Sequence, residues 1–181
     1  ATPATFLKFN RALRARVAVY LGDYAGALTA LGQSFLDTGQ PLTLGVYHTF
    51  STAPGDSTNN LFDPSARAIV VNPALLADAQ KQVDGVTPDK RIVDKTIVLS
   101  DPKTAQGLSS NLASPSAGIP IIRNEELILL RAEANIGLHN LAAALSDINF
   151  IRQTSGNLPP YAGPVDQASL LNELLYNKVA R

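Results

Sequence analysis

The sequence contains no cysteine, which excludes disulfide bonds, thiolate nucleophiles and zinc–cysteine sites from this chain. It also contains no apolar run close to the roughly 20 residues that a membrane-spanning helix needs. Fifteen basic and fifteen acidic side chains give a net charge of zero. Non-specific binding to nucleic acids needs a basic face, and binding to an anionic membrane surface needs a polybasic patch. We therefore expect no nucleic-acid partner.

Methionine is absent too, even at the first position, and the start of the chain lacks the pattern of a signal peptide. The last residues, LLNELLYNKVAR, have a helical pattern with no stop signal. We expect the chain to be an excised part of a longer protein. Its 181 residues, of which 45% are hydrophobic, are enough for one compact domain.

A helical hairpin is predicted over 5–38, whose length is close to the roughly 34-residue period of tetratricopeptide repeats. Apolar side chains of its first helix recur every three or four residues, which predicts a buried stripe of Phe6, Phe9, Leu13, Val17 and Tyr20. The second helix follows a Gly-Asp break and extends over 24–37. Ala15 and Ala27 are the small residues at which these two helices would cross.

Regular patterns fade over 41–118, where Pro, Gly, Ser, Thr, Asn and Asp are frequent. A structureless loop of this length is uncommon in a compact domain, so we expect short elements inside it. The β-branched runs 68–71 and 97–99 are candidates for two paired strands. Residues 73–82 are a candidate helix with proline in its first turn.

A second helical hairpin is predicted over 122–154, with Asn124 as a cap for its first helix. Another helix begins in 166–181. These patterns predict an all-α fold in which tetratricopeptide-like hairpins form an α/α superhelix. The chain 1–181 would be a single, partial domain, and its long irregular insertion could hold a short two-stranded β element.

Motifs for catalysis and for metal binding are incomplete. Neither histidine has a partner at helical spacing or an HExxH context, so a metal site is unsupported. Ser100 and Lys103 match a Ser-x-x-Lys pattern, but Pro102 obstructs the helix which that motif needs. Residues 56–60 are rich in oxygen atoms but lack the glycine and glutamate of a calcium loop, which leaves a solvated loop or weak cation binding. We expect no catalytic residue, no metal and no cofactor.

Acidic and basic side chains alternate along the predicted second hairpin. We expect ion pairs that brace the hairpin among these residues, which are Arg123, Glu125, Glu126, Arg131, Glu133 and Arg152. The sequence also has one tight aromatic cluster, VYHTF, around His48. This cluster has two possible roles, local packing of a loop or a stacking surface for the apolar faces of sugar rings.

The order of residues in IIRNEELILLRAEANIGLHNLAAALSDINFIRQTSG resembles the recurring helical segment of the SusD/RagB family. The shared features are an arginine before an acidic helix, then Ala132-Glu133-Ala134, then a second helix that ends in Asn149-x-x-Arg152. ALRARVAVYLGDYAGAL resembles an earlier repeat of the family, and LLNELLYNK resembles the start of its C-terminal helix.

The resemblance implies a surface-exposed lipoprotein of the outer membrane that binds oligosaccharide or another nutrient without catalysis. It implies a partner, the SusC-like TonB-dependent transporter, to which the nutrient is delivered. Membrane attachment would use an N-terminal lipid anchor, which these 181 residues do not contain. Loop aromatic and polar side chains would bind the ligand, and the candidates are Tyr47, His48, Phe50, Asn59, Asn60 and Tyr161.

Two other functions remain open at this point. A tetratricopeptide-type adaptor would bind a peptide or protein in a helical groove, and it predicts contiguous repeats and no secretion signal. An enzyme would need a convergent polar site, which the motifs above do not provide.

Overall fold

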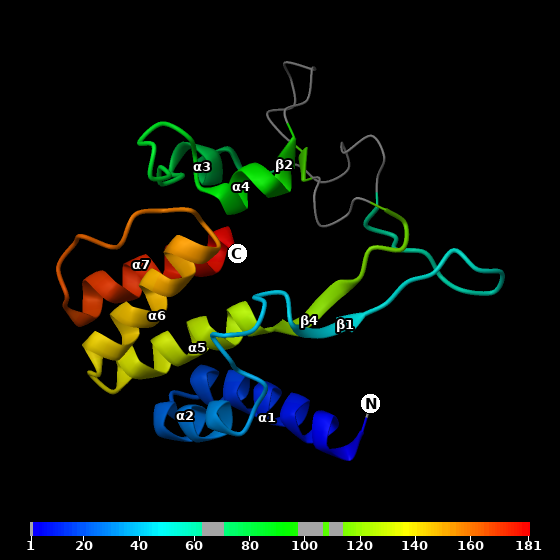
Figure 1. The fold of residues 1–181 in the computed structure, drawn as a ribbon, viewed down its shortest axis with the longest axis horizontal. Helices are drawn as coiled ribbons and strands as arrows, with labels where there is room; N and C mark the ends of the chain where they lie inside the picture. The colour runs from blue at the N-terminus through cyan, green and yellow to red at the C-terminus, as the bar shows by residue number, and fades with distance from the viewer. Residues whose placement is uncertain (1, 63–70, 98–106, 109–113) are drawn as a thin grey trace.

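The computed structural model describes residues 2–62, 71–97, 107–108 and 114–181 (Figure 1). Helices predominate in these segments, as the sequence predicted. The seven helices of the described residues are α1 (Pro3–Tyr20), α2 (Tyr24–Gly32), α3 (Pro73–Ala77), α4 (Lys90–Lys95), α5 (Asn124–Gly137), α6 (Leu141–Thr154) and α7 (Gln167–Ala180). None of them combines the length and the apolar character that would let it cross a membrane.

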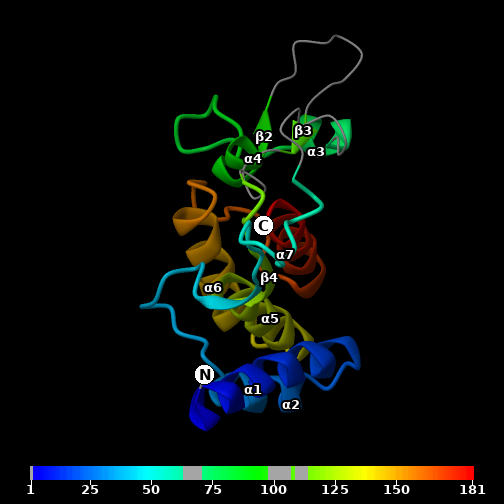
Figure 2. The same ribbon diagram turned by 90° about the vertical axis from the view of Figure 1, so that its right-hand side faces the viewer.

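Helix α5 lies at the centre of a helical stack. The α1–α2 hairpin packs on one side of it, and α6 and α7 pack on the other (Figures 1 and 2). Alanines line the contact between α1 and α2, and among them Ala15 and Ala27 have no exposed surface, as predicted. Their small side chains let the helix backbones approach closely. The larger side chains of Leu127 and Leu130, from α5, complete this part of the core.

The buried stripe predicted for the first helix is only partly correct. Phe9 and Leu13 pack against the core, but Phe6, Val17 and Tyr20 are exposed on the opposite side of α1. Ala12, Ala15, Ala18 and Val19 form the buried side instead. Apolar periodicity marked the larger side chains, and it could not detect that alanines provide the contact surface here.

Helix α2 ends at Gly32, short of the predicted end at position 37. The backbone of 37–41 is held by Asn124, which is fully buried. Its amide nitrogen donates to the carbonyl oxygen of Asp37 at 2.7 Å, and its amide oxygen accepts from the Asp37 nitrogen at 3.1 Å. The predicted role of Asn124 as a helix cap is therefore wrong, because Arg123 is the N-cap residue and Asn124 begins α5.

Two small antiparallel sheets accompany the helices. Strand β1 (Gly45–His48) pairs with β4 (Ile119–Arg123), and β2 (Thr96–Ile97) pairs with β3 (Gly107–Leu108). The sequence predicted one such element inside 41–118, formed by 68–71 and 97–99, but β2 pairs with 107–108 instead and Val71 is not in a strand. Of the strands proposed over 68–71 and 97–99, residues 68–70 and 98–99 lie outside the described residues.

The β1–β4 ribbon brings the two ends of the long insertion together. A Cβ atom added at Gly45 would lie 2.3 Å from the carbonyl oxygen of Ile122, so only glycine allows the strands to approach this closely. The register shifts between Val46 and Tyr47, as at a β-bulge. The ribbon projects from the helical stack and carries the loop 49–62 at its end (Figure 1).

Buried polar contacts attach the segment 72–95 to α6 and α7. The Arg152 guanidinium donates to Glu173 Oε1 and to Gln80 Oε1, at 2.5 Å in both cases. The Tyr176 hydroxyl donates to Asp89 Oδ2 at 2.9 Å. Helix α3 ends at Ala77, before the predicted end at position 82, and Gln80 then takes part in this polar contact.

Candidate ligand-binding site

The loop that follows β1 contains a polar hollow, which we call the loop pocket. Its volume is about 330 Å³. This is at the lower end of the range of about 300–1,000 Å³ that ligand pockets span. The residues that line it are His48, Thr49, Phe50, Ser51, Asp56 and Ser57.

A tight turn gives the loop that lines the pocket its shape. The Ser51 nitrogen donates to the carbonyl oxygen of Ser57 at 3.1 Å, and the Asp56 nitrogen donates to that of Ala53 at 3.0 Å. Gly55 has a φ of 90°, a backbone conformation that glycine adopts without strain. The Pro-Gly pair at 54–55 was the sequence signal for this turn, which brings Asp56 beside Ser51.

One wall of the loop pocket is aromatic. The rings of His48 and Phe50 lie edge to face, with their centroids 4.6 Å apart and their planes at 84°. Thr49, Ser51 and Asp56 line the same hollow, so two hydroxyl groups and a carboxylate lie near it, and the Ser51 hydroxyl oxygen accepts from the Ala53 nitrogen at 3.0 Å. An apolar face beside several hydrogen-bonding groups suits a ligand that has both apolar faces and many hydroxyl groups.

Asn59 and Asn60, also candidates from the sequence, do not line the loop pocket. The Asn59 side chain is buried, its amide nitrogen donates to the Ala117 carbonyl oxygen at 2.8 Å, and its amide oxygen accepts from the Leu61 nitrogen at 2.9 Å. Its backbone nitrogen donates to the Pro115 carbonyl oxygen at 2.7 Å. Asn59 thus ties the loop to the segment before β4, and the neighbouring Asn60 is exposed.

Tyr47 and Tyr161 occupy two other places. Tyr47 is half-buried in β1, and its hydroxyl donates to the Thr43 carbonyl oxygen. Tyr161 lies between α6 and α7, where its ring packs on their hydrophobic cluster and its backbone nitrogen donates to Asn149 Oδ1 at 2.7 Å. The structure therefore brings together only His48 and Phe50 of the six candidates.

Charged residues of the second hairpin are paired, as expected, but several partners lie outside the hairpin. Glu126 pairs with Arg16 of α1 at 2.6 Å and with Arg181 at 2.8 Å, and Glu133 pairs with Lys178 of α7. Two further pairs are Arg123–Glu125 at 3.1 Å and Arg131–Asp147 at 2.7 Å. Except for Arg123–Glu125, these pairs join α5 to α1, α6, α7 and Arg181. Within the part of the chain that the structure describes, no group of three or more His, Asp or Glu side chains could hold a metal ion.

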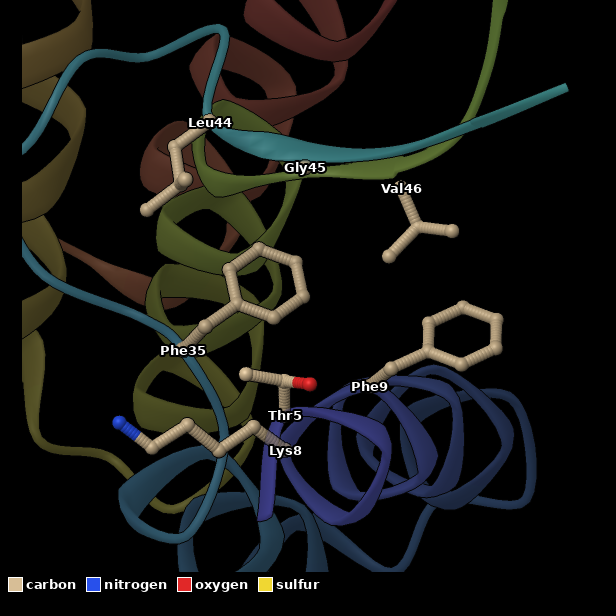
Figure 3. A pocket seen from close by; sticks show the side chains of 7 residues that line it. All are labelled: Thr5, Lys8, Phe9, Phe35, Leu44, Gly45 and Val46. Carbon is tan, nitrogen blue, oxygen red and sulfur yellow. The ribbon is translucent and has the colours of Figure 1, made fainter. Parts of the chain in front are cut away.

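A second hollow is almost entirely apolar. It has a volume of about 270 Å³ and lies between the start of α1, the segment after α2 and β1. Figure 3 shows the side chains of Phe9, Phe35, Leu44 and Val46 around a common space, with the amine of Lys8 pointing away from it. The hydroxyl of Thr5 already donates to the Thr2 carbonyl oxygen. This hollow suits an apolar group better than a polyhydroxylated ligand.

His139, another sequence candidate for chemistry, does not line either hollow. His139 is exposed in the turn between α5 and α6, with a φ of 61°. The Ser-x-x-Lys pattern at 100–103 lies outside the described residues.

Comparison with known proteins identifies the fold of this chain. No protein-family model matches the chain, and no curated protein sequence matches it. A crystal structure of a SusD superfamily protein from Bacteroides vulgatus ATCC 8482 is similar, with a TM-score of 0.66 and 15% sequence identity. The similarity covers 94% of this chain and 47% of the solved chain, so the chain spans about half the length of that protein. The chain therefore has a SusD-like fold.

Proposed function

We propose that this chain is part of a nutrient-binding protein of the SusD type, which binds oligosaccharide or a similar polyhydroxylated nutrient without changing it chemically. The fold supports this proposal at the level of the whole chain. The loop pocket supports it at the level of the site, because it joins an aromatic wall to hydroxyl and carboxylate groups. The aromatic pair of His48 and Phe50 is the single observation that carries the assignment.

The geometry of a sugar explains the choice of ligand class. Its ring has an apolar face of C–H groups, which packs on an aromatic side chain, and a rim of hydroxyl groups that need hydrogen-bond partners. Phe50 and His48 would pack on the apolar face of the sugar ring. Thr49, Ser51 and Asp56 would form hydrogen bonds with its hydroxyl groups.

The position of the loop pocket also suits binding. Residues of the loop after β1 line the pocket. The β1–β4 ribbon, which carries this loop, projects from the helical stack (Figure 1). Binding residues commonly lie on loops that a rigid scaffold positions. The buried Asn59 fixes the far end of the loop, so the pocket is partly ordered before a ligand arrives.

The cellular role in this proposal follows the SusD type. The protein would be an outer-membrane lipoprotein, exposed at the surface and anchored by a lipid attached outside residues 1–181. It would deliver its ligand to a SusC-like TonB-dependent transporter.

Calorimetric titration of the full-length protein against a panel of glycans tests the proposal. We expect saturable binding of at least one glycan, no hydrolysis of that glycan, and co-purification of a TonB-dependent transporter from native membranes. Absence of binding across the panel, together with absence of a co-purifying transporter, would contradict the proposal.

A tetratricopeptide-type adaptor is the second candidate, and the apolar hollow of Figure 3 favours it. Its walls could take one apolar side chain of a bound peptide. Replacement of Phe35 by alanine would then weaken capture of a peptide partner and leave glycan binding unchanged.

A further inference from the structure

The loop pocket carries one formal charge. Of the residues that line it, only Asp56 is charged when histidine is neutral. The chain around the pocket adds no other: residues 38–62 contain no further Asp, Glu, Lys or Arg, and residues 114–122, which include most of β4, contain none. Within this part of the fold, the carboxylate of Asp56 is therefore the source of a negative potential.

The turn determines where this carboxylate lies. The backbone nitrogen of Asp56 donates to the Ala53 carbonyl oxygen, and the carbonyl oxygen of the next residue, Ser57, accepts from the Ser51 nitrogen. Asp56 forms no salt bridge with another described residue, so no cation in that part of the chain neutralises it. The residue is exposed, and water screens its charge. Its interactions with a ligand are consequently modest and depend on salt.

Sugars of one ring type differ in charge. A neutral sugar has hydroxyl groups only, an amino sugar can carry an ammonium group, and a uronic acid carries a carboxylate. A uronic acid in the loop pocket would place its carboxylate near that of Asp56, and like charges repel. The ammonium group of an amino sugar would be attracted to the same carboxylate.

The aromatic wall acts in the same direction as the carboxylate. The face of a phenylalanine ring attracts a cation, because the ring has a negative face and a positive edge. Phe50 and Asp56 line one hollow, so both can act on an ammonium group held there. A carboxylate gains nothing from either residue.

We propose that Asp56 makes the loop pocket selective by charge, so that it prefers a sugar with a free amino group to the neutral sugar, and the neutral sugar to the uronic acid. The inference rests on the proposed function, since a sugar must enter the loop pocket. Exposed ion pairs are weak, so each step of this order corresponds to about a two- to fivefold difference in affinity. Asp56 is thus a specificity-determining residue of the pocket.

Two matched series of sugars test the order on the full-length protein. The first is glucose, glucosamine and glucuronic acid, and the second is galactose, galactosamine and galacturonic acid. Ligand-observed NMR titration at neutral pH and low salt measures the six affinities. We expect amino sugar, neutral sugar and uronic acid to bind in that order in at least one series. The differences should shrink at high salt, because exposed charges are then screened.

Substitutions show whether Asp56 causes the order. The readout is the ratio of the affinities for the amino sugar and the uronic acid on one protein, so a general loss of binding cancels. Asp56→Asn keeps the size of the side chain and should bring the ratio close to one, and Asp56→Lys should invert it. Asp94→Asn is the control, because it removes an exposed carboxylate of α4 that does not line the loop pocket. It should keep the native ratio.

The inference and the proposed function fail on different results. Neutral sugars that bind as tightly as both charged ones, or a native ratio that persists in Asp56→Asn, would overturn the inference and leave the proposed function standing. Absence of binding of all six sugars would also overturn the inference. The glycan panel then decides whether the proposed function falls with it.

Discussion

At the scale of single residues, Lys95 shows how burial changes the pKa of an ammonium group. Its ammonium group donates to the Ala180 carbonyl oxygen at 2.8 Å, at the end of α7. Burial lowers the pKa of Lys95 from 10.5 to about 8, although the carboxylate of Glu125 acts in the opposite direction. The folded protein thus loses this proton more readily than the unfolded chain does.

The consequence for stability has a definite sign. Between about pH 8 and pH 10 the unfolded state binds more protons at Lys95 than the folded state, so the free energy of unfolding rises with pH there. Burial raises the pKa of Tyr176 above its ordinary value, and this lowers stability only as the pH rises above about 10. The two effects therefore occupy different pH ranges.

We predict that Lys95→Gln flattens the rise in unfolding free energy between pH 8 and pH 10. Urea denaturation of the full-length protein at several pH values measures the unfolding free energy across this range. Lys90→Gln is the matched control, since Lys90 is exposed and pairs with the exposed Asp94. A rise of the same size in Lys95→Gln and in the native protein would show that another group causes it.

At the scale of elements, local pattern predicted the helices of the described residues except α4, and it missed the ribbon that holds the loop pocket. Capping signals and apolar periodicity lie within each hairpin, so the sequence could indicate them. The pairing of β1 with β4 joins residues far apart in the chain, and the short strand Gly45–His48 has no distinctive pattern. The second hairpin was predicted to begin at position 122, whereas Ile122 and Arg123 belong to β4, which pairs with β1.

Two glycine substitutions distinguish the effect on stability of the β1–β4 ribbon from that of a helix end. Gly45→Ala should destabilise the full-length protein by more than about 1 kcal/mol, because the new Cβ would lie 2.3 Å from the Ile122 carbonyl oxygen. Gly32→Ala should be neutral or stabilise by up to about 1 kcal/mol, since it meets no atom within 4 Å at the end of α2. Thermal denaturation of both variants measures the difference, and equal effects would contradict the close strand approach.

At the scale of the whole molecule, the sequence predicted the helical scaffold better than the site. The order of residues in the second hairpin indicated a SusD-like fold, and the structural similarity confirms that fold. Of the six ligand-binding candidates, only His48 and Phe50 line the loop pocket, and they belong to the aromatic cluster that the sequence shows. The candidates did not include the other four lining residues, Thr49, Ser51, Asp56 and Ser57, because the folded turn brings 51 and 56–57 together.

The remaining candidates show why composition is a weak guide to a binding site. Asn59 has the right chemistry for a sugar, but its amide nitrogen donates to Ala117, before β4, and its amide oxygen accepts from Leu61 of the loop. Tyr161 has a suitable ring, but the ring packs on α6 and α7. Which polar or aromatic group faces a ligand depends on tertiary contacts that the sequence does not encode locally.

The most direct test of the account is the affinity of Phe50→Ala for the best glycan, measured by titration calorimetry on the full-length protein. We predict a loss of about tenfold, since an aromatic contact contributes about 0.5–1.5 kcal/mol beyond burial. Leu61→Ala is the matched control, because Leu61 is exposed on the same loop but does not line the pocket. Equal affinities of Phe50→Ala, Leu61→Ala and the native protein would contradict the assignment of the ligand to the loop pocket.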